Sequence, residues 1–143
     1  MSNPFDNPDY LKLLQTKKAL EDYGKSEVLK YEKYRVSMFS QSLAEKVQEN
    51  KDPQAEYNID SFDEQARPLS IDVKTTADLN GTNPFELSIQ EYRSMVRKKE
   101  QYQIYRVYAI HSTKPSFYKL KYPLDDVVDR YQKDFLCAIK PRG

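Results

Sequence analysis

Two short runs of alternating polar and apolar residues constrain the fold of this chain more than any other feature. The runs Tyr57–Phe62 and Leu69–Lys74 flank the polar segment Asp63–Pro68. Alternation with a period of two is typical of β-strands, and a polar segment containing proline between two such runs is typical of a hairpin loop. The sequence therefore predicts an antiparallel β-hairpin over residues 57–74.

The register of this hairpin follows from its loop, which is centred near Gln65. Asn58 then lies about opposite Asp72. A shift by one residue would bury the polar side of each strand, so the apolar sides align only if four polar residues share the other face. These residues are Asn58, Asp60, Asp72 and Lys74. We therefore expect two carboxylates, an amide and a lysine together.

The rest of the chain predicts helices that flank a sheet. We expect helices from Asn7 to a stop or kink at Gly24, from Ser26 to between Phe39 and Gln41, and from Ser88 to about Glu100, with a further helix start at Pro123. Ser88 and Glu91 have capping-box spacing. Strands are expected at Tyr102–Ile110, Phe117–Tyr122 and Phe135–Ile139, and residues 43–48 fit either a strand or a helix. The fold class predicted is α/β (α+β), with a mixed sheet of about five strands flanked by helices.

Length and composition exclude several classes of protein. The 143 residues suffice for one domain with a buried core, which we place at residues 24–143 after a helical extension at residues 1–23. Three glycines exclude glycine-rich phosphate loops, and the single Cys137 and His111 exclude a disulfide framework and a Cys/His zinc site. The sequence lacks the pattern of a signal peptide or a membrane span, which predicts a cytoplasmic protein.

Charge is distributed unevenly along the chain. Residues 45–72 contain eight acids and three bases, whereas residues 88–121 contain eight bases and two acids. Two interpretations stay open. The segments are two solvated faces of opposite sign, or they are an acidic metal pocket beside a basic strip that follows a phosphate backbone.

Asp72 and Lys74 stand two residues apart on one strand face, which is a pattern that a metal-dependent phosphodiesterase needs. Carboxylates hold Mg²⁺, which polarises a phosphate and activates a water, while a lysine orients that water or stabilises the phosphate. Asp-x-Lys also occurs as an ordinary surface ion pair. The spacing by itself leaves both interpretations open.

The wider sequence around this pair resembles the NO VEIN C-terminal domain family. The resemblance runs in consistent order from about Gly24 to Tyr122. The segments that carry it are Gly24–Leu29 with Tyr31-Glu32, then Tyr57–Asp63, Ile71–Thr76, Pro84–Ser88 and Tyr102–Tyr108. That family is similar to the PD-(D/E)XK nuclease superfamily, which implies a restriction-endonuclease-like fold and a divalent-cation site.

The resemblance also implies roles for individual residues. The implied catalytic residues are Asp72, Lys74 and Glu27, and the implied ligands of Mg²⁺ or Mn²⁺ are Asp72, Asn58, Asp60 and Glu27. Asn58 stands where the family usually has a metal-binding aspartate, and its amide oxygen brings no charge to a cation. Asp60, two residues on, is either its replacement or a solvated strand acid, and Glu27 is either a ligand or an acid favoured by a helix N-terminus.

Two functions follow from the resemblance. The first is a nucleic-acid-processing domain that hydrolyses phosphodiester bonds, with DNA as its expected partner. The second is a catalytically degraded module that binds DNA, a protein partner or a second copy of itself. Four basic residues are expected either to contact phosphate or to form a solvated helix face: Arg93, Arg97, Lys98 and Lys99. A third possibility is an interaction subunit whose acidic segment meets a basic partner.

Overall fold

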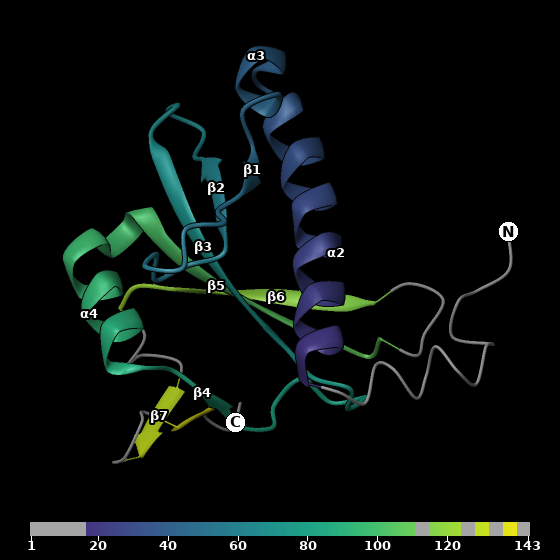
Figure 1. The fold of residues 1–143 in the computed structure, drawn as a ribbon, viewed down its shortest axis with the longest axis vertical. Helices are drawn as coiled ribbons and strands as arrows, with labels where there is room; N and C mark the ends of the chain where they lie inside the picture. The colour runs from purple at the N-terminus through teal and green to yellow at the C-terminus, as the bar shows by residue number, and fades with distance from the viewer. Residues whose placement is uncertain (1–16, 111–114, 124–127, 132–135, 140–143) are drawn as a thin grey trace, which may run out of the picture.

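The computed structural model describes residues 17–110, 115–123, 128–131 and 136–139. Its main sheet has five strands in the order β1-β2-β3-β5-β6 (Figure 1). The strands are β1 (Gln48–Glu49), β2 (Ile59–Phe62), β3 (Pro68–Thr75), β5 (Tyr102–Tyr108) and β6 (Ser116–Lys121). β3 and β5 are parallel and the other neighbours are antiparallel, so the predicted mixed sheet is confirmed.

A second, smaller sheet is antiparallel and has the order β4-β8-β7. Its strands are β4 (Phe85–Glu86), β7 (Val128–Tyr131) and β8 (Leu136–Ile139). β8 confirms the strand expected near the end of the chain. The helix expected from Pro123 falls partly on residues 124–127, which lie outside the described residues, and the four residues after them form β7 instead of a helix.

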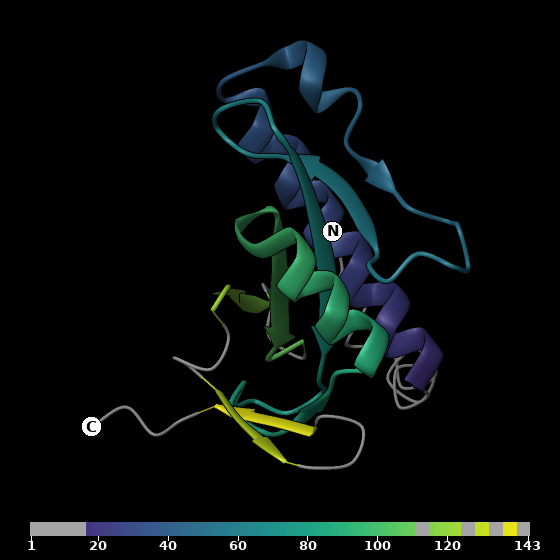
Figure 2. The ribbon, with the colours of Figure 1, turned by 90° about the vertical axis from the view of Figure 1, so that its left-hand side faces the viewer.

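Two long helices lie on opposite faces of the main sheet (Figure 2). α2 (Lys17–Ser37) covers one face, and α4 (Ile89–Lys98), which continues into the 3₁₀ turn η2 (Lys99–Gln101), covers the other. A short helix, α3 (Gln41–Ala44), is capped by Ser40 and precedes β1, so residues 43–48 contain the end of a helix and the start of a strand. No helix among the described residues has the length and apolar character required to span a membrane.

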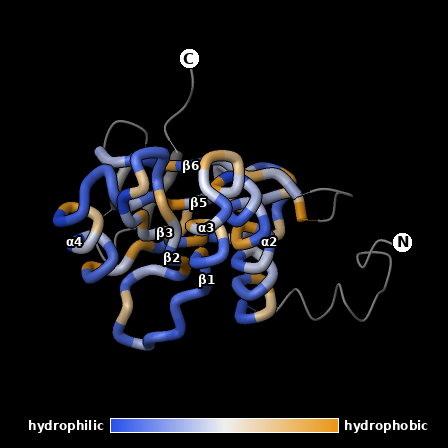
Figure 3. The backbone as a smooth tube through the Cα atoms, turned by 90° about the horizontal axis from the view of Figure 1, so that it is seen from above, coloured by the Kyte–Doolittle hydropathy of each residue, from blue (hydrophilic) through white to orange (hydrophobic). Residues whose placement is uncertain are grey.

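Each face of the sheet has its own hydrophobic core. On the α2 side, Val28 and Val36 pack with Ile59, Ile71 and Tyr105. On the α4 side, the buried residues include Leu87, Met95, Tyr102, Ile104 and Leu120. Apolar stretches of β3 and β5 accordingly lie between the two helices (Figure 3).

The predicted hairpin is confirmed, including its register. Ile59 pairs with Ile71, which places Asn58 opposite Asp72. Ile59, Ile71 and Val73 belong to the core on the α2 side, whereas Asp72 and Lys74 lie on the side of Glu91 and α4. Tyr102 and Tyr105 are buried in the two cores, as expected of residues on an internal strand.

Gly24 does not end or kink a helix, contrary to the sequence prediction. α2 runs from Lys17 to Ser37 without interruption, so the expected second start at Ser26 is also wrong. A Cβ at Gly24 would lie 1.7 Å from Oγ1 of Thr75 on β3. Glycine is present here because the helix backbone approaches the strand closely. The helix start expected at Asn7 lies outside the described residues.

Candidate functional site

The candidate site lies where β3 loses its neighbour on one side. β2 pairs with residues 68–71 of β3, whereas β5 pairs with residues 70–75. The last four residues of β3 therefore have a strand on one side only. A pocket of about 890 Å³ opens here, lined by residues of α2, of β3 and of the segment from Asn83 to Glu91.

Three charged side chains meet in this pocket. Nζ of Lys74 lies 2.8 Å from Oε2 of Glu91 and 3.3 Å from Oδ2 of Asp72. The side chain of Asp72 is 4% exposed, and those of Lys74 and Glu91 are each 19% exposed. The predicted pair Asp72–Lys74 is thus brought together, and a second carboxylate that the sequence analysis did not assign to the site joins it from α4.

Burial and charge act in opposite directions on these groups. Burial raises the pKa of Asp72 well above its usual range, although the positive charge of Lys74 opposes this shift. Burial would also raise the pKa of Glu91, but its contact with Asp72 and the charge of Lys74 outweigh burial and hold that pKa at about 2. The two carboxylates together outweigh burial at Lys74 and raise its pKa. Lys74 is therefore a cation held between two acids.

Asn58 lines the same pocket, but its side chain has a structural partner. Its Oδ1 accepts a hydrogen bond from the backbone N–H of Val73 at 2.7 Å. Its own backbone N–H donates to the carbonyl of Ile71. The amide thereby extends the β2–β3 pairing by one step beyond the last strand residue.

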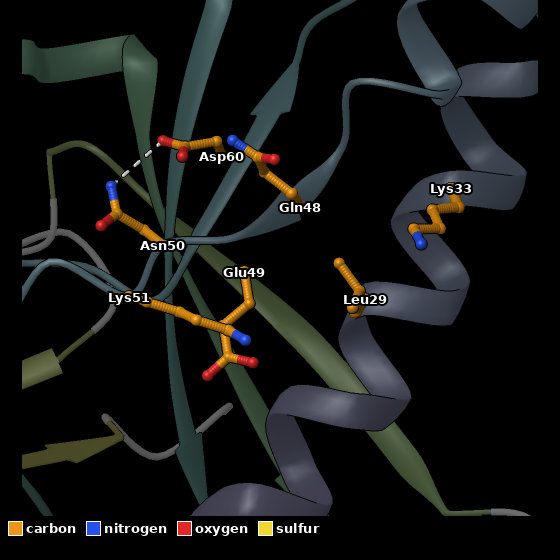
Figure 4. A pocket seen from close by; sticks show the side chains of 7 residues that line it. All are labelled: Leu29, Lys33, Gln48, Glu49, Asn50, Lys51 and Asp60. Carbon is orange, nitrogen blue, oxygen red and sulfur yellow. Dashed lines mark hydrogen bonds between the residues drawn. The ribbon is translucent and has the colours of Figure 1, made fainter.

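Asp60 lies in a different pocket from Asp72. Its Oδ1 accepts hydrogen bonds from the hydroxyl of Tyr57 at 2.7 Å and from Nδ2 of Asn50 at 3.5 Å. With Asn50 it lines a polar pocket of about 730 Å³ between α2 and the segment that contains β1 (Figure 4). The structure therefore separates Asp60 from the Asp72–Lys74 pair, and its role as a replacement ligand stays a prediction.

Glu27 is also outside the pocket that contains Asp72. It lies on α2, its side chain is 30% exposed, and Oε1 is 3.6 Å from Nζ of Lys30. The acid of α2 that the fold buries is Glu32, which binds Arg35, Ser61 and Tyr105. A catalytic or ligand role for Glu27 rests on the family resemblance alone and stays a prediction.

Arg106 forms part of the wall of the pocket next to Lys74. The two residues are register partners on β5 and β3. Nη2 of Arg106 donates to the carbonyl and the side-chain oxygen of Asn83, and its guanidinium carbon lies 5.3 Å from the ring centre of Phe85. These contacts fix the segment that leads to α4, so Arg106 helps position Glu91 through that segment.

The four basic residues of α4 and of the start of η2 have different surroundings. Arg93, Arg97 and Lys99 are exposed, and Arg97 lies 3.6 Å from Glu56. Lys98 turns toward the sheet, where Nζ donates to Oγ of Ser70 at 2.8 Å and lies 4.1 Å from the ring centre of Tyr57. Burial lowers the pKa of Lys98, and the neighbouring charge of Arg97 adds to this effect. Three of the four are thus exposed and Lys98 bonds within the fold, and contact of these residues with nucleic acid stays a prediction.

Only an indirect signal in the sequence pointed to a role for Glu91 in the site. Its position three residues after Ser88 predicted a capping box, which the structure confirms with two reciprocal bonds of 3.0 Å each. The cap uses Oε1 of Glu91, so Oε2 remains for Lys74. Spacing along the helix did not reveal which strand residue this second oxygen would meet.

Residues 21–120 match the family model described as Protein NO VEIN, C-terminal. No curated protein and no solved structure matches the chain. The matched segment covers more than two thirds of the 143 residues and contains β3, α4 and β5, with Asp72, Lys74, Glu91 and Arg106 inside it. The match confirms the resemblance seen in the sequence: the chain belongs to the NO VEIN C-terminal family.

Proposed function

We propose that this domain acts on nucleic acid and hydrolyses phosphodiester bonds with the help of Mg²⁺ or Mn²⁺, as a relative of the restriction-endonuclease-like nucleases. The observation that carries the proposal is the meeting of Asp72 and Lys74 at 3.3 Å in an open pocket, at the end of an internal strand. DNA is the partner that we expect. The pocket has a volume of about 890 Å³.

The residues present fit a hard divalent cation. Oδ2 of Asp72 is buried and no described residue donates a hydrogen bond to it, although buried polar atoms in folded proteins are nearly always bonded. A carboxylate oxygen is the ligand that Mg²⁺ prefers, and one or two carboxylates with water and substrate phosphate usually suffice. Among the described residues, no group of three or more Asp, Glu, His or Cys side chains gathers, so the proposal needs this smaller ligand set. A bound cation would polarise the phosphate and lower the pKa of a water.

The chain's own residues supply the remaining steps. Asp72, once ionised, would hold the cation, and Lys74 keeps its own proton because the neighbouring carboxylates raise its pKa. Lys74 stabilises the negative charge that develops on the phosphate or orients the attacking water. Arg93, Arg97 and Lys99 bind the phosphate backbone away from the reacting bond.

The second candidate function is a module that binds nucleic acid or a protein without hydrolysis. Asn58 favours it, because an amide that accepts a backbone hydrogen bond replaces a charged ligand. Losing one charge about 4 Å from a cation costs on the order of 4 kcal/mol at an effective dielectric constant of about 20. A second copy of the chain is one such protein partner.

The test is to incubate supercoiled plasmid and single-stranded DNA with the wild type, with Lys74→Ala and with Lys25→Ala, in Mg²⁺, in Mn²⁺ and in EDTA. Lys25 is a matched control, because it lines the same pocket but pairs with Asp22 and Glu49. We expect cleavage that requires the metal, is lost in Lys74→Ala and persists in Lys25→Ala. Circular dichroism confirms that both variants fold.

Absence of cleavage by the folded wild type in every condition would reject hydrolysis. Fluorescence anisotropy with labelled DNA then decides whether the binding module remains. Binding that weakens steeply with salt supports contact with several phosphates, and replacing one phosphate-contacting arginine lowers the salt slope by about 1. No binding at low salt would leave only a protein partner.

A further inference from the structure

The pocket contains a second carboxylate besides that of Asp72. Glu91 comes from α4, and Lys74 Nζ is within 3.3 Å of an oxygen of each acid. Asn58 contributes no charge, and its Oδ1 already accepts a hydrogen bond from the backbone N–H of Val73 on β3. With Glu91, the pocket again presents two carboxylates.

The backbone around Glu91 fixes where its carboxylate points. Oε1 accepts the N–H of Ser88, and Ser88 in turn accepts the N–H of Glu91, so the capping box holds the side chain at the first turn of α4. Oε2 is consequently directed at Lys74. A carboxylate held by its own helix cap is preorganised, because one oxygen stays anchored while the other binds.

An independent observation points to a cationic ligand between these acids. Asp72 lines the pocket and its Oδ2 is buried; its charged neighbours there are the Lys74 ammonium at 3.3 Å and the carboxylate of Glu91, and no donor among the described residues gives this oxygen a hydrogen bond. Lys74 thus places one positive charge beside two acids, and its hydrogen bond goes to Glu91. A small divalent cation would bring two charges to the same pair of carboxylates and supply the missing contact to Asp72.

We infer that Glu91 is the second carboxylate ligand of the divalent-cation site and replaces the charge absent at Asn58. This inference rests on the proposed function and names a ligand for it that lies on a helix rather than on β2. When the two carboxylates bind a divalent cation, the Lys74 ammonium loses both of its partners. It is then free to bind a phosphate oxygen of the substrate.

The test measures Mn²⁺ binding to the full chain without nucleic acid, from the electron paramagnetic resonance signal of free Mn²⁺. Glu91→Gln is the decisive variant, because glutamine keeps the capping box while it removes the charge. Glu86→Gln is the matched control, because Glu86 lines the same pocket but is exposed. We expect Glu91→Gln to weaken binding by at least about tenfold and Glu86→Gln to leave it unchanged within about twofold.

A rescue variant separates charge from structure. Asn58→Asp should restore most of the Mn²⁺ affinity in the Glu91→Gln background, since it returns one negative charge to the pocket. Urea unfolding of each variant shows whether it is folded during the measurement. Failure of Asn58→Asp to restore any affinity would overturn the idea that Glu91 compensates for position 58.

Cleavage assays on the same proteins distinguish this inference from the proposed function. Tight Mn²⁺ binding and metal-dependent cleavage in Glu91→Gln would overturn the role of Glu91 and leave hydrolysis by Asp72 and Lys74 intact. A folded wild type that binds no Mn²⁺ would overturn both. Loss of Mn²⁺ binding in Glu91→Gln alone supports the ligand role, whatever the rate of cleavage.

Discussion

Each face of the main sheet buries one acid, and the two acids differ in how completely their carboxylates are hydrogen-bonded. On the α2 side, Glu32 is fully buried and its carboxylate accepts four hydrogen bonds, from Nε and Nη2 of Arg35, from Ser61 and from Tyr105. On the α4 side, Asp72 is 3% exposed and its Oδ2 receives no hydrogen bond from the part of the chain that the structure describes. Both acids lie beside a cation, but only Glu32 receives full compensation for burial.

The pKa shifts record the same difference. Burial would raise the pKa of Glu32, but hydrogen bonds from Arg35, Tyr105 and Ser61 outweigh it and lower that pKa. For Asp72 burial prevails and the pKa rises. A buried acid with full hydrogen bonding holds elements together, whereas a buried acid left incompletely bonded costs stability. Burial of an acid therefore does not indicate function by itself; an unsatisfied acid facing a pocket does.

The largest expected effect comes from removing the charge of Glu32. Glu32→Gln leaves Arg35 without its buried partner and forces an NH₂ group toward donors, so we expect the free energy of unfolding to fall by about 3 kcal/mol or more. Urea denaturation measures this loss. Glu27→Gln, on the same helix but with a partly exposed ion pair, should change stability by less than about 0.5 kcal/mol. Equal stability of the two variants would remove the contrast drawn for the α2 face.

The next effect tests how closely α2 docks against β3 beside the pocket. Gly24→Ala puts a methyl group 1.7 Å from Oγ1 of Thr75, and strand β3 cannot move without disturbing its pairing with β5. Overpacking of this kind costs about 1–3 kcal/mol. Thermal unfolding of Gly24→Ala, Thr75→Ala and the double variant measures it. Thr75→Ala should recover part of the loss, and additive losses would show that the two positions do not meet.

The hairpin and its polar face could be predicted because both depend on local pattern. Alternation fixed which side of each strand is buried, and two residues of spacing on one strand placed Asp72 beside Lys74. The family match added the expectation of a site there. These features depend on residues that are close together in the sequence, so the pattern of the sequence predicts them.

The remaining parts of the site depend on packing between distant elements. Glu91 meets Lys74 because α4 crosses the sheet at that point, and Glu32 meets Tyr105 across 73 residues. Gly24 was interpreted as a stop because glycine often ends helices, but the reason for it lies on β3, far along the chain. Asp60 lies on β2, the strand next to β3, and still lines another pocket, where its side chain bonds Tyr57 and Asn50.

The smallest expected effect is the pH dependence of stability, which has opposite signs for the buried acids of the two faces. A pKa raised by folding means that the folded protein binds the Asp72 proton more tightly than the unfolded chain, so Asp72 lowers stability as pH rises from about 3.8 through its folded pKa. Glu32 has a lowered pKa and contributes stability that is lost as pH falls below about 4.5.

In EDTA at pH 7, Asp72→Asn should therefore be more stable than the wild type, by about 1–2 kcal/mol, while Lys74 keeps its bond to Glu91. Near pH 4, where the Asp72 carboxyl is protonated in the folded protein, urea denaturation should find little of this gain. A variant that is less stable than the wild type at pH 7 would mean that Asp72 is as well compensated as Glu32, and the contrast between the two faces would fail.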